Sequence, residues 1–246
     1  MTFLQALISG IVQGLTEFLP VSSSGHLVIM HKLMGMEGPQ LSFDIFLHVG
    51  TLAAIFIVFW KDIIEAVTVK RKIGFFILMA TAVTVLCVLF FGKGIEAAFG
   101  NVKMVGAMLV VTGIWLILGS FLRFGSGGIS GLKAILIGLA QAIAVMPGIS
   151  RSGVTISTGL FLGLDGQAAA RFSFLLAIPA IIGAALFKIK DPALTGFSPI
   201  YLIGFITSCI IGVLSLKLLL RVLYKNKFHL FGIYCIILGL VALLFL

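Results

Sequence analysis

The sequence predicts an all-α integral membrane protein with six transmembrane helices and two re-entrant helical hairpins, arranged as an inverted-topology repeat. Of its 246 residues, 61% are hydrophobic and only 10% are charged, whereas about 25% of residues are charged in soluble proteins. The apolar runs show no strand-like alternation, which favours helices over a barrel. A polar stretch near the beginning recurs in the second half without a gap, which indicates an internal duplication.

The repeat relates the two most polar stretches within the apolar runs. The first is QGLTEFLPVSSSGH, residues 13–26, and the second is QAIAVMPGISRSGVT, residues 141–155. We therefore divide the chain into a first repeat, residues 1–124, and a second, inverted repeat, residues 131–246, within a single membrane domain. One constant offset superposes Gly10 on Gly138, Gln13 on Gln141, Ser22 on Ser150, Ser24 on Ser152 and Gly25 on Gly153.

The first repeat begins with an apolar run that breaks at Pro20. No basic residue precedes Lys32, so this run lacks the positive flank of a cleaved signal peptide and is expected to remain in the mature protein. A segment at residues 27–34 is too short to cross a bilayer, which needs about 20 residues. Three longer runs follow, at residues 43–60, 73–91 and 102–122. They are separated by a charged, amphipathic connector at 61–72 and a loop at 92–101.

The second repeat follows the same plan after the glycine-rich turn at residues 125–131. Its first apolar run, 132–146, breaks at Pro147 and leads into a short return segment at 153–164. If both broken runs are re-entrant, each repeat crosses the membrane three times, and this odd number inverts the second repeat. Three further spans are expected at residues 171–187, 199–220 and 228–246.

The basic residues favour this topology over one in which every broken run crosses the membrane. Re-entrant hairpins place eleven basic residues on one face and five on the other, with Arg151 at a hairpin tip, whereas eight crossings divide all seventeen eight against nine. By the positive-inside rule, both termini and the mouth of the first hairpin then face away from the cytoplasm. The eleven are Lys61, Lys70, Arg71, Lys72, Arg123, Lys133, Arg171, Lys217, Arg221, Lys225 and Lys227.

Charge and cysteine usage exclude two other classes of function. The formal net charge of +9 comes from short basic clusters between apolar runs, so we interpret it as a topology signal and a contact with anionic lipid, with no nucleic-acid partner. Cys87, Cys209 and Cys235 lie in apolar segments without paired spacing. They are expected to be reduced core residues, with no disulfide or zinc site.

Two charged residues lie at hairpin depth, Glu17 and Arg151. A charged side chain at the bilayer centre costs about 2.5–3.5 kcal/mol on insertion scales, so both residues require a function or a partner. A structural ion pair between the hairpin tips is the simpler interpretation, but the motifs carry more polar groups than such a pair needs. These are Ser22, Ser23, Ser24, His26, Ser150, Ser152 and Thr155.

The pattern predicts an anion site, and phosphate suits it best. A short helix is expected to begin after each break, near Ser24 and near Gly153, and to direct its free N–H groups toward the middle. Arg151 between two such helix ends can bind a phosphate through paired hydrogen bonds. Gln13 and Glu17, one helical turn apart, could hold a divalent cation together with phosphate oxygens of the substrate.

Several residues are candidates for the chemical step. His26 could act as acid, base or nucleophile, or it could cap the short helix. Ser23 is a rival nucleophile with His26 one turn away as its base, although some of the serines are expected only to cap helices. His48 lies within a span and is a weaker candidate. His31, Lys32 and His229 are expected near the interfaces, in contact with solvent.

These two motifs closely resemble the signature motifs of the bacterial undecaprenyl-diphosphatase family, also called the bacitracin-resistance proteins. The resemblance covers essentially the whole chain in length, spacing and hydropathy. It implies conversion of undecaprenyl diphosphate to undecaprenyl phosphate and inorganic phosphate, which recycles the lipid carrier of cell-wall synthesis. It also implies six spans with two re-entrant hairpins, a divalent cation such as Mg²⁺ or Ca²⁺, a bacterial inner-membrane location and, often, dimers.

The resemblance also assigns roles to individual residues. Glu17 matches the second acid of the family's (E/Q)xxxE pattern, and Gln13 occupies the variable first position, which leaves one carboxylate in this motif. Ser23 and His26 match the residues proposed as nucleophile or proton donor. The residues that match the diphosphate-binding positions are Ser150, Arg151 and Thr155.

The sequence thus predicts a membrane phosphohydrolase acting on a polyprenyl diphosphate. The catalytic candidates are Glu17, Ser23, His26 and Arg151, and the substrate-binding candidates are Gln13, Ser22, Ser24, Ser150, Ser152 and Thr155. A transporter or flippase for a polyprenyl phosphate lipid is the alternative, because inverted repeats with broken helices are also a transporter plan. The concentration of Glu17, Ser23 and His26 in one hairpin favours the enzyme.

Overall fold

The computed structural model consists of helices, with no strand in the part of the chain that it describes. The described residues are 1–38, 40–91, 98–121, 125, 127–188, 198–223 and 228–246. Ten helices are assigned within these ranges. They are α1 (Phe3–Thr16), α2 (Ser23–Leu33), α3 (Leu41–Thr68), α4 (Arg71–Phe91), α6 (Val102–Ser120), α7 (Gly131–Ile143), α8 (Arg151–Phe161), α9 (Gly166–Lys188), α10 (Pro199–Leu223) and α11 (Phe228–Phe245).

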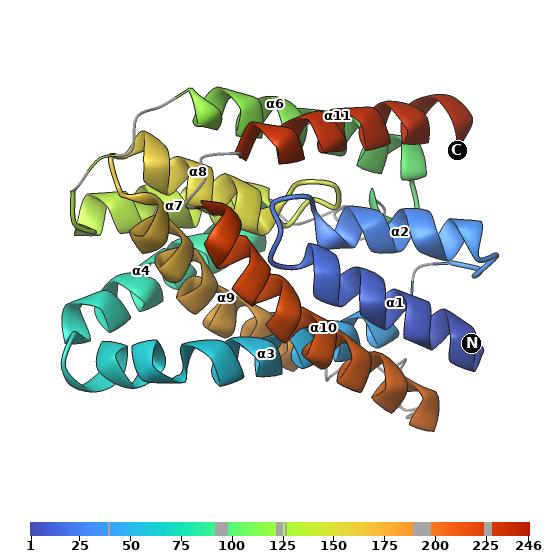
Figure 1. Cartoon of the computed structure of the whole chain (residues 1–246), viewed down its shortest axis with the longest axis horizontal. Coiled ribbons are helices and arrows are strands. Elements are labelled where there is room, and N and C mark those ends of the chain that lie inside the picture. The colour runs from blue at the N-terminus through green and yellow to red at the C-terminus, as the bar shows by residue number, and fades with distance from the viewer. Residues whose placement is uncertain (39, 92–97, 122–124, 126, 189–197, 224–227) are drawn as a thin grey trace.

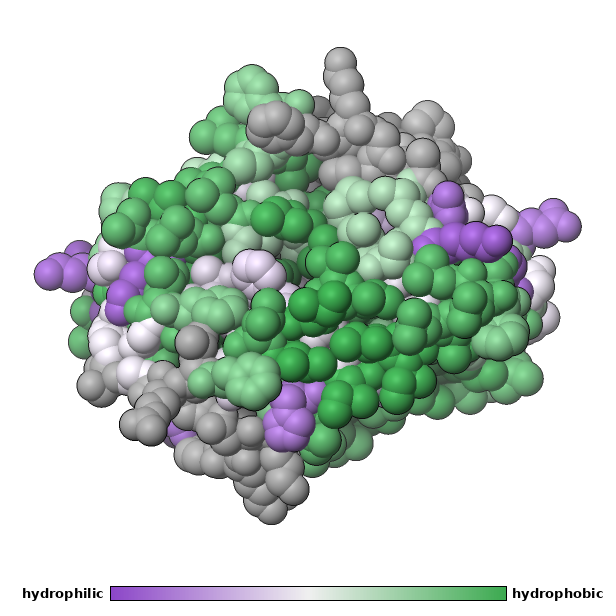
Figure 2. Space-filling model, turned by 90° about the horizontal axis from the view of Figure 1, so that it is seen from above, coloured by the Kyte–Doolittle hydropathy of each residue, from purple (hydrophilic) through white to green (hydrophobic). Residues whose placement is uncertain are grey.

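Six of these helices are long and apolar enough to cross a membrane: α3, α4, α6, α9, α10 and α11. The prediction of six spans is therefore confirmed. In Figure 2 the hydrophobic residues form a broad area across the middle of the molecule, and hydrophilic residues gather toward its left and right edges. This distribution is the one expected for a surface that faces lipid between two polar interfaces.

The four short helices pair into two hairpins, α1 with α2 and α7 with α8, which approach the middle of the molecule from opposite ends (Figure 1). The turns at residues 17–22 and 144–150 are largely buried. Each hairpin packs along a spanning helix from the other half of the chain, because α1 lies on α10 and α7 lies on α4. Helices α6 and α11, the last of each half, pack against each other.

Glycine allows the close approach of α6 and α11. A Cβ atom on Gly113 would lie 2.5 Å from the carbonyl oxygen of Gly232, and one on Gly239 would lie 2.6 Å from that of Gly106. No side chain fits at these distances, so the two backbones are in direct contact. This is the packing that small residues permit between helices in lipid, where apolar burial supplies little attraction.

The predicted amphipathic connector at residues 61–72 is helical for most of its length. Helix α3 continues to Thr68 and α4 begins at Arg71, which leaves only a short turn. The sequence from 61 to 72 contains neither glycine nor proline, so no residue in it stops the helix. A kink at Phe59, with φ −105° and ψ 20°, bends the helix near the expected boundary instead.

The remaining boundaries agree closely with the predicted ones. The break at Pro20 falls between the end of α1 and the start of α2, and the break at Pro147 falls between α7 and α8. Parts of the predicted loop at 92–101 and of the glycine-rich turn at 125–131 lie outside the described residues, namely 92–97 and 126. Residue 122, the predicted end of the third span, also lies outside them.

Candidate active site

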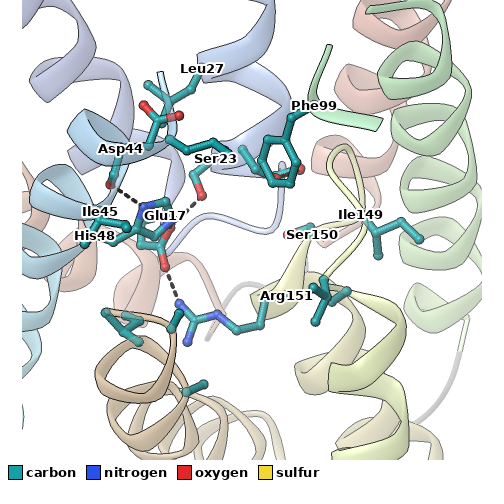
Figure 3. Close-up of a pocket in the computed structure, with 18 of the residues that line it drawn as sticks. Glu17, Ser23, Leu27, Asp44, Ile45, His48, Phe99, Ile149, Ser150 and Arg151 are labelled. Carbon is teal, nitrogen blue, oxygen red and sulfur yellow. Dashed lines mark hydrogen bonds and ion pairs between the residues drawn. The ribbon is translucent and has the colours of Figure 1, made fainter. Parts of the chain in front are cut away.

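A cavity of about 420 Å³ lies where the two hairpin turns meet (Figure 3). Its polar wall includes Glu17 and Ser23 from the first hairpin and Arg151 from the second. Helices α3, α4 and α9 supply most of the remaining wall, which is predominantly apolar. The site therefore combines the two predicted motifs with residues from the spanning helices.

The first hairpin turns sharply at Ser22. This residue has a φ of 68°, in the left-handed region that only glycine adopts without cost. Its hydroxyl accepts a hydrogen bond from the Gly25 N–H at 3.3 Å and caps α2. A non-glycine residue in this conformation must be held by its surroundings, and such strain is concentrated at functional sites. The turn places Ser23 and the N-terminus of α2 at the cavity.

The second hairpin is held by Thr112 of α6. Its hydroxyl donates to the carbonyl oxygen of Gly148 at 2.9 Å and accepts from the Ser150 N–H at 3.1 Å. Gly148 has a φ of 96°, which a side chain would disfavour. Ser150 then caps α8 by accepting from the Gly153 N–H at 3.1 Å. Helix α8 consequently begins at Arg151, at the cavity wall.

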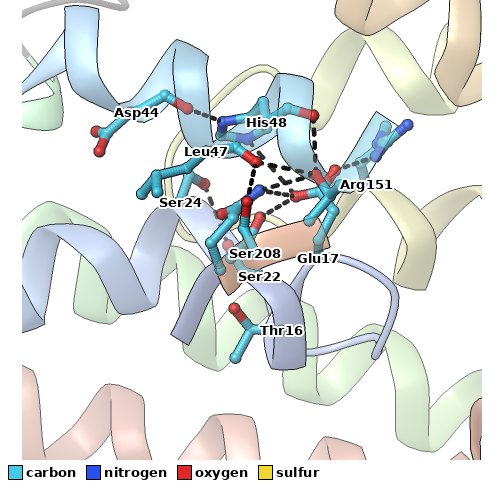
Figure 4. A network of polar contacts seen from close by, with 12 residues as sticks. Thr16, Glu17, Ser22, Ser24, Asp44, Leu47, His48, Arg151 and Ser208 are labelled. Atoms are coloured by element: carbon cyan, nitrogen blue, oxygen red, sulfur yellow. Dashed lines mark hydrogen bonds and ion pairs between the residues drawn. The ribbon is translucent and has the colours of Figure 1, made fainter. Parts of the chain in front are cut away.

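Glu17 is the centre of the polar network (Figure 4). One carboxylate oxygen, Oε1, forms an ion pair with Nη2 of Arg151. The other, Oε2, accepts hydrogen bonds from Ser23 Oγ at 2.5 Å and from Gln13 Nε2 at 3.0 Å. Gln13 is completely buried, and its amide nitrogen also lies 3.4 Å from Thr51 Oγ1. The predicted link between the hairpin tips is therefore present, and it forms part of a larger network.

Arg151 is only partly satisfied by this network. Its Nη1 atom is buried and has no hydrogen-bond partner in the protein. A guanidinium with one nitrogen on Glu17 and another unpaired can donate to an anion in the cavity. The N-termini of α2 and α8 flank the same cavity, through Ser23 and Ser150. The groups that were predicted to form an anion site therefore lie around one cavity.

His48 is the site residue whose importance the sequence analysis underestimated. It lines the cavity, and its Nε2 atom lies 3.5 Å from Glu17 Oε2. Its Nδ1 atom lies 2.7 Å from the backbone carbonyl oxygen of Asp44. Asp44, which the sequence analysis did not consider, also lines the cavity, but its carboxylate points away from Glu17 (Figure 4). The available signal was an acid and a histidine one turn apart within a span.

His26 faces away from the cavity toward α11. Its Nδ1 atom lies 2.8 Å from the carbonyl oxygen of Ser22, and its Nε2 atom lies 2.7 Å from the hydroxyl of Tyr234. The two rings are stacked, with centroids 5.6 Å apart. The structure therefore connects Ser23 to Glu17 rather than to His26.

The other predicted binding residues fall into two groups. Ser22, Ser24 and Ser150 line the cavity. Ser152 and Thr155 are buried in contacts between elements, since Ser152 Oγ donates to the Leu19 carbonyl oxygen at 3.1 Å and Thr155 Oγ1 lies 2.6 Å from Ser173 Oγ. The hydroxyls of Ser152 and Thr155 thus hold the hairpins in place.

The expectation that His31 is in contact with solvent is wrong. The residue is buried, its Nε2 atom lies 3.2 Å from Ser9 Oγ and 3.8 Å from Asp44 Oδ1, and its ring lies against Phe43. Helix α2 packs against α1 and α6, and the His31 side chain near its end also contacts α3, so the end of this short helix is covered. A single sequence does not indicate how deeply a short helix is packed.

The donors around Glu17 fit a divalent cation only in part. In the described portion of the chain, no three histidine, cysteine, aspartate or glutamate side chains gather as a metal cluster. The Oε1 atom of Gln13 is buried without a hydrogen-bond partner, beside the Glu17 carboxylate. One carboxylate and one amide oxygen supply two ligands, and Mg²⁺ needs six. Phosphate oxygens and water would have to provide the others.

Comparison with known proteins gives one consistent result. The model of the family "Bacitracin resistance protein BacA" matches residues 6–241. A protein from Desulfosudis oleivorans named "Undecaprenyl-diphosphatase" is 44% identical, with 98% of this chain and 97% of the relative covered. Proteins with the same name from Methanosphaera stadtmanae and Halothermothrix orenii are 42% and 39% identical, and the comparison covers 97% or more of every chain.

Proposed function

Since this chain belongs to the BacA family of bacitracin resistance proteins, we infer that it hydrolyses undecaprenyl diphosphate to undecaprenyl phosphate and inorganic phosphate. The observation that carries this inference is the Glu17–Arg151 pair at the wall of a largely apolar cavity between two helix N-termini. Such a cavity suits a ligand with an anionic head and an apolar tail. The protein is accordingly a multi-pass membrane enzyme.

Arg151 binds the diphosphate in this proposal. Its unpaired Nη1 atom donates to a phosphate oxygen, and the helix N-termini at Ser23 and Ser150 supply further N–H groups. These donors offset the loss of hydration of a multiply charged group in a site with little water. They also stabilise the negative charge that develops on the bridging oxygen as the bond to phosphorus breaks.

Glu17 and Ser23 carry the chemical step in the arrangement that the geometry favours. Ser23 Oγ attacks the terminal phosphorus, its proton passes to Glu17 Oε2 over the existing 2.5 Å hydrogen bond, and undecaprenyl phosphate leaves. Water then attacks the phosphorus of the phosphoserine, Glu17 returns its proton to the departing Ser23 oxygen, and inorganic phosphate is released with the protons of the water. A water molecule activated directly by Glu17 would give the same products in one step.

His26 remains a candidate for nucleophile or proton donor. Its Nε2 atom would first have to separate from Tyr234 and turn toward the cavity. Trapping of a phosphoenzyme intermediate distinguishes the three candidate nucleophiles. An acid-stable phosphoserine at Ser23 supports the serine route, an acid-labile phosphohistidine supports His26, and direct transfer of oxygen-18 from water without a phosphoenzyme supports activated water.

A divalent cation, Mg²⁺ or Ca²⁺, would be held by Glu17 and Gln13 together with substrate phosphates. When bound, it would neutralise phosphate charge and polarise the phosphorus centre. The orphaned Oε1 atom of Gln13 supports this assignment. Because the protein supplies so few ligands, we expect cation binding to depend on the substrate, and a chelator to lower turnover without unfolding the protein.

We further propose that the two hairpins are re-entrant and that the halves form an inverted repeat in the bacterial inner membrane. The exchange of partners between halves, α1 on α10 and α7 on α4, supports this arrangement. The site then opens to the periplasmic face, and a homodimer is compatible with the exposed apolar helices. A flippase for the lipid product is the second candidate, supported by the meeting of broken helices at mid-depth.

The deciding experiment measures phosphate release from undecaprenyl diphosphate by the purified protein in detergent. We expect turnover that falls when a chelator is added and recovers with Mg²⁺ or Ca²⁺. The proposal of an enzyme would be overturned in favour of a flippase if the protein released no phosphate under any condition but moved the lipid across the bilayer of vesicles.

A further inference from the structure

The cavity has two chemically different sides. The Glu17–Arg151 pair and Ser23 lie on one side. The wall that α9 forms is apolar and contains three alanines, with one further apolar residue from α4. These residues are Ala180, Ile181, Ala184, Ala185 and Val88.

The apolar side reaches the molecular surface. Ala184 lines the cavity and is also exposed, so the mouth of the cavity lies beside this residue. Its neighbours Ile182 and Leu186 are 38% and 59% exposed. Large apolar side chains exposed on a spanning helix face lipid in a membrane protein. The mouth is therefore oriented toward the bilayer interior.

The size of the cavity limits what it can hold. A volume of about 420 Å³ falls in the range of pockets that enclose drug-sized ligands. It accommodates a diphosphate and the first part of a prenyl chain, whereas a long polyprenyl tail must continue outside. The chain consequently has to pass the mouth, where the side chain of Ala184 is a single methyl group.

We propose that Val88, Ala180 and Ala184 form a prenyl port through which the tail of the substrate leaves the cavity, and that Ala180 and Ala184 determine its width. This inference rests on the proposed function and deepens it, because it names the residues that select for a lipid-linked diphosphate. Ala180 and Ala184 are one helical turn apart and share a face of α9. A larger side chain at either position would occupy the path of the tail.

Ala184→Phe tests the prenyl port, with Ile182→Phe as its matched control. Both substitutions add a phenyl ring to the same turn of α9, but only Ala184 lines the cavity. The kcat/KM for undecaprenyl diphosphate is expected to fall about tenfold or more in Ala184→Phe, mainly through a higher KM, and to stay within about twofold in Ile182→Phe. Ala180→Leu should reproduce the loss if Ala184→Phe does not yield folded protein.

A diphosphate with a single isoprene unit reports the anion site separately. Its tail ends inside the cavity, so its inhibition constant against undecaprenyl diphosphate should be the same in the parent and in Ala184→Phe. An equal loss for both ligands would overturn the prenyl port, as would full activity of Ala184→Phe and Ala180→Leu on the long substrate. A parent protein that releases no phosphate from undecaprenyl diphosphate would instead overturn the proposed function itself.

Discussion

At the scale of single residues, Arg151 is the group on which the proposed chemistry depends most. Its Nη2 atom pairs with Glu17 and its Nη1 atom is left for the substrate. We expect Arg151→Ala to lower kcat about a hundredfold or more, and Arg151→Lys to retain only a small fraction, because lysine keeps the charge but loses the planar pair of donors. Phosphate release measures both variants. Arg171→Ala, which removes an exposed ion pair with Asp62, serves as the control.

A variant with both Glu17 and Arg151 replaced tests whether Arg151 serves only to form the ion pair. If Arg151 and Glu17 merely neutralise each other, replacing both by neutral residues should restore stability and activity relative to either single variant. We expect stability to recover in Glu17→Gln/Arg151→Ala while activity stays at background. A double variant that releases phosphate at nearly the parent rate would show that the pair is structural.

Tyr234 controls the availability of His26. The carbonyl oxygen of Ser22 can only accept, so a neutral His26 carries its proton on Nδ1, and its Nε2 atom accepts from the Tyr234 hydroxyl. Tyr234→Phe keeps the stacked ring and removes this donor. We expect carbethoxylation of His26 to become about fivefold faster, as for a lost hydrogen bond of about 1 kcal/mol. Mass spectrometry of the labelled peptide gives the rate, with His229 as the reference histidine. Equal labelling in both proteins would refute the bond.

At the scale of elements, the position of the second hairpin depends on α6 through one hydroxyl. Thr112→Val removes the partner of two buried backbone groups, at Gly148 and Ser150. We expect the free energy of unfolding to fall by about 2 kcal/mol and the thermal midpoint to fall by about 5 °C. Turnover should also fall, because Arg151 is less firmly placed. Thr112→Ser should restore both. Thr81→Val is the control, since Thr81 bonds only within its own helix. An unchanged midpoint in Thr112→Val would contradict this role.

The hairpins and spans were predictable because their signals are local. Pro20 and Pro147 interrupt apolar runs, and a run of about 20 apolar residues is sufficient to identify a span. The charged connector at residues 61–72 is helical for most of its length, because the lack of glycine or proline allows α3 to continue to Thr68. Charge position indicates the interface of the membrane, and a helix can extend beyond it.

The contacts between elements were not predictable from the sequence. Tyr234 and His26 are 208 residues apart, and nothing in α11 marks which of its faces meets α2. His48 lies on a helix that is apolar around most of its circumference, so its direction toward Glu17 follows only from the packing of α3. The candidate residues of the two motifs were identified, whereas the partners that α3 and α11 supply required the three-dimensional arrangement.

At the scale of the whole molecule, the positions of the chain ends bear on the predicted topology. Both termini lie at the same end of the structure in Figure 1, and the turn between α3 and α4 lies at the opposite end. This agrees with six crossings and two hairpins that return to the side from which they enter. The side carrying the α3–α4 turn also carries eleven of the basic residues under the predicted topology, against five on the other side. The positive-inside rule assigns this side to the cytoplasm.

We therefore expect both ends of the chain to lie outside the cytoplasm. An alkaline phosphatase fused after Leu246 should be active, because that enzyme folds only where disulfides form, and a fluorescent protein inserted at Lys70 should be bright. The reciprocal pair, a fluorescent protein after Leu246 and alkaline phosphatase at Lys70, should give no signal. The inverted repeat requires an odd number of crossings between the α3–α4 turn and the end of α11, so these two points must lie on opposite faces of the membrane. Fluorescence from the C-terminal fusion would therefore contradict the inverted repeat. The access route of the anionic headgroup would then have to be assigned to the cytoplasmic face.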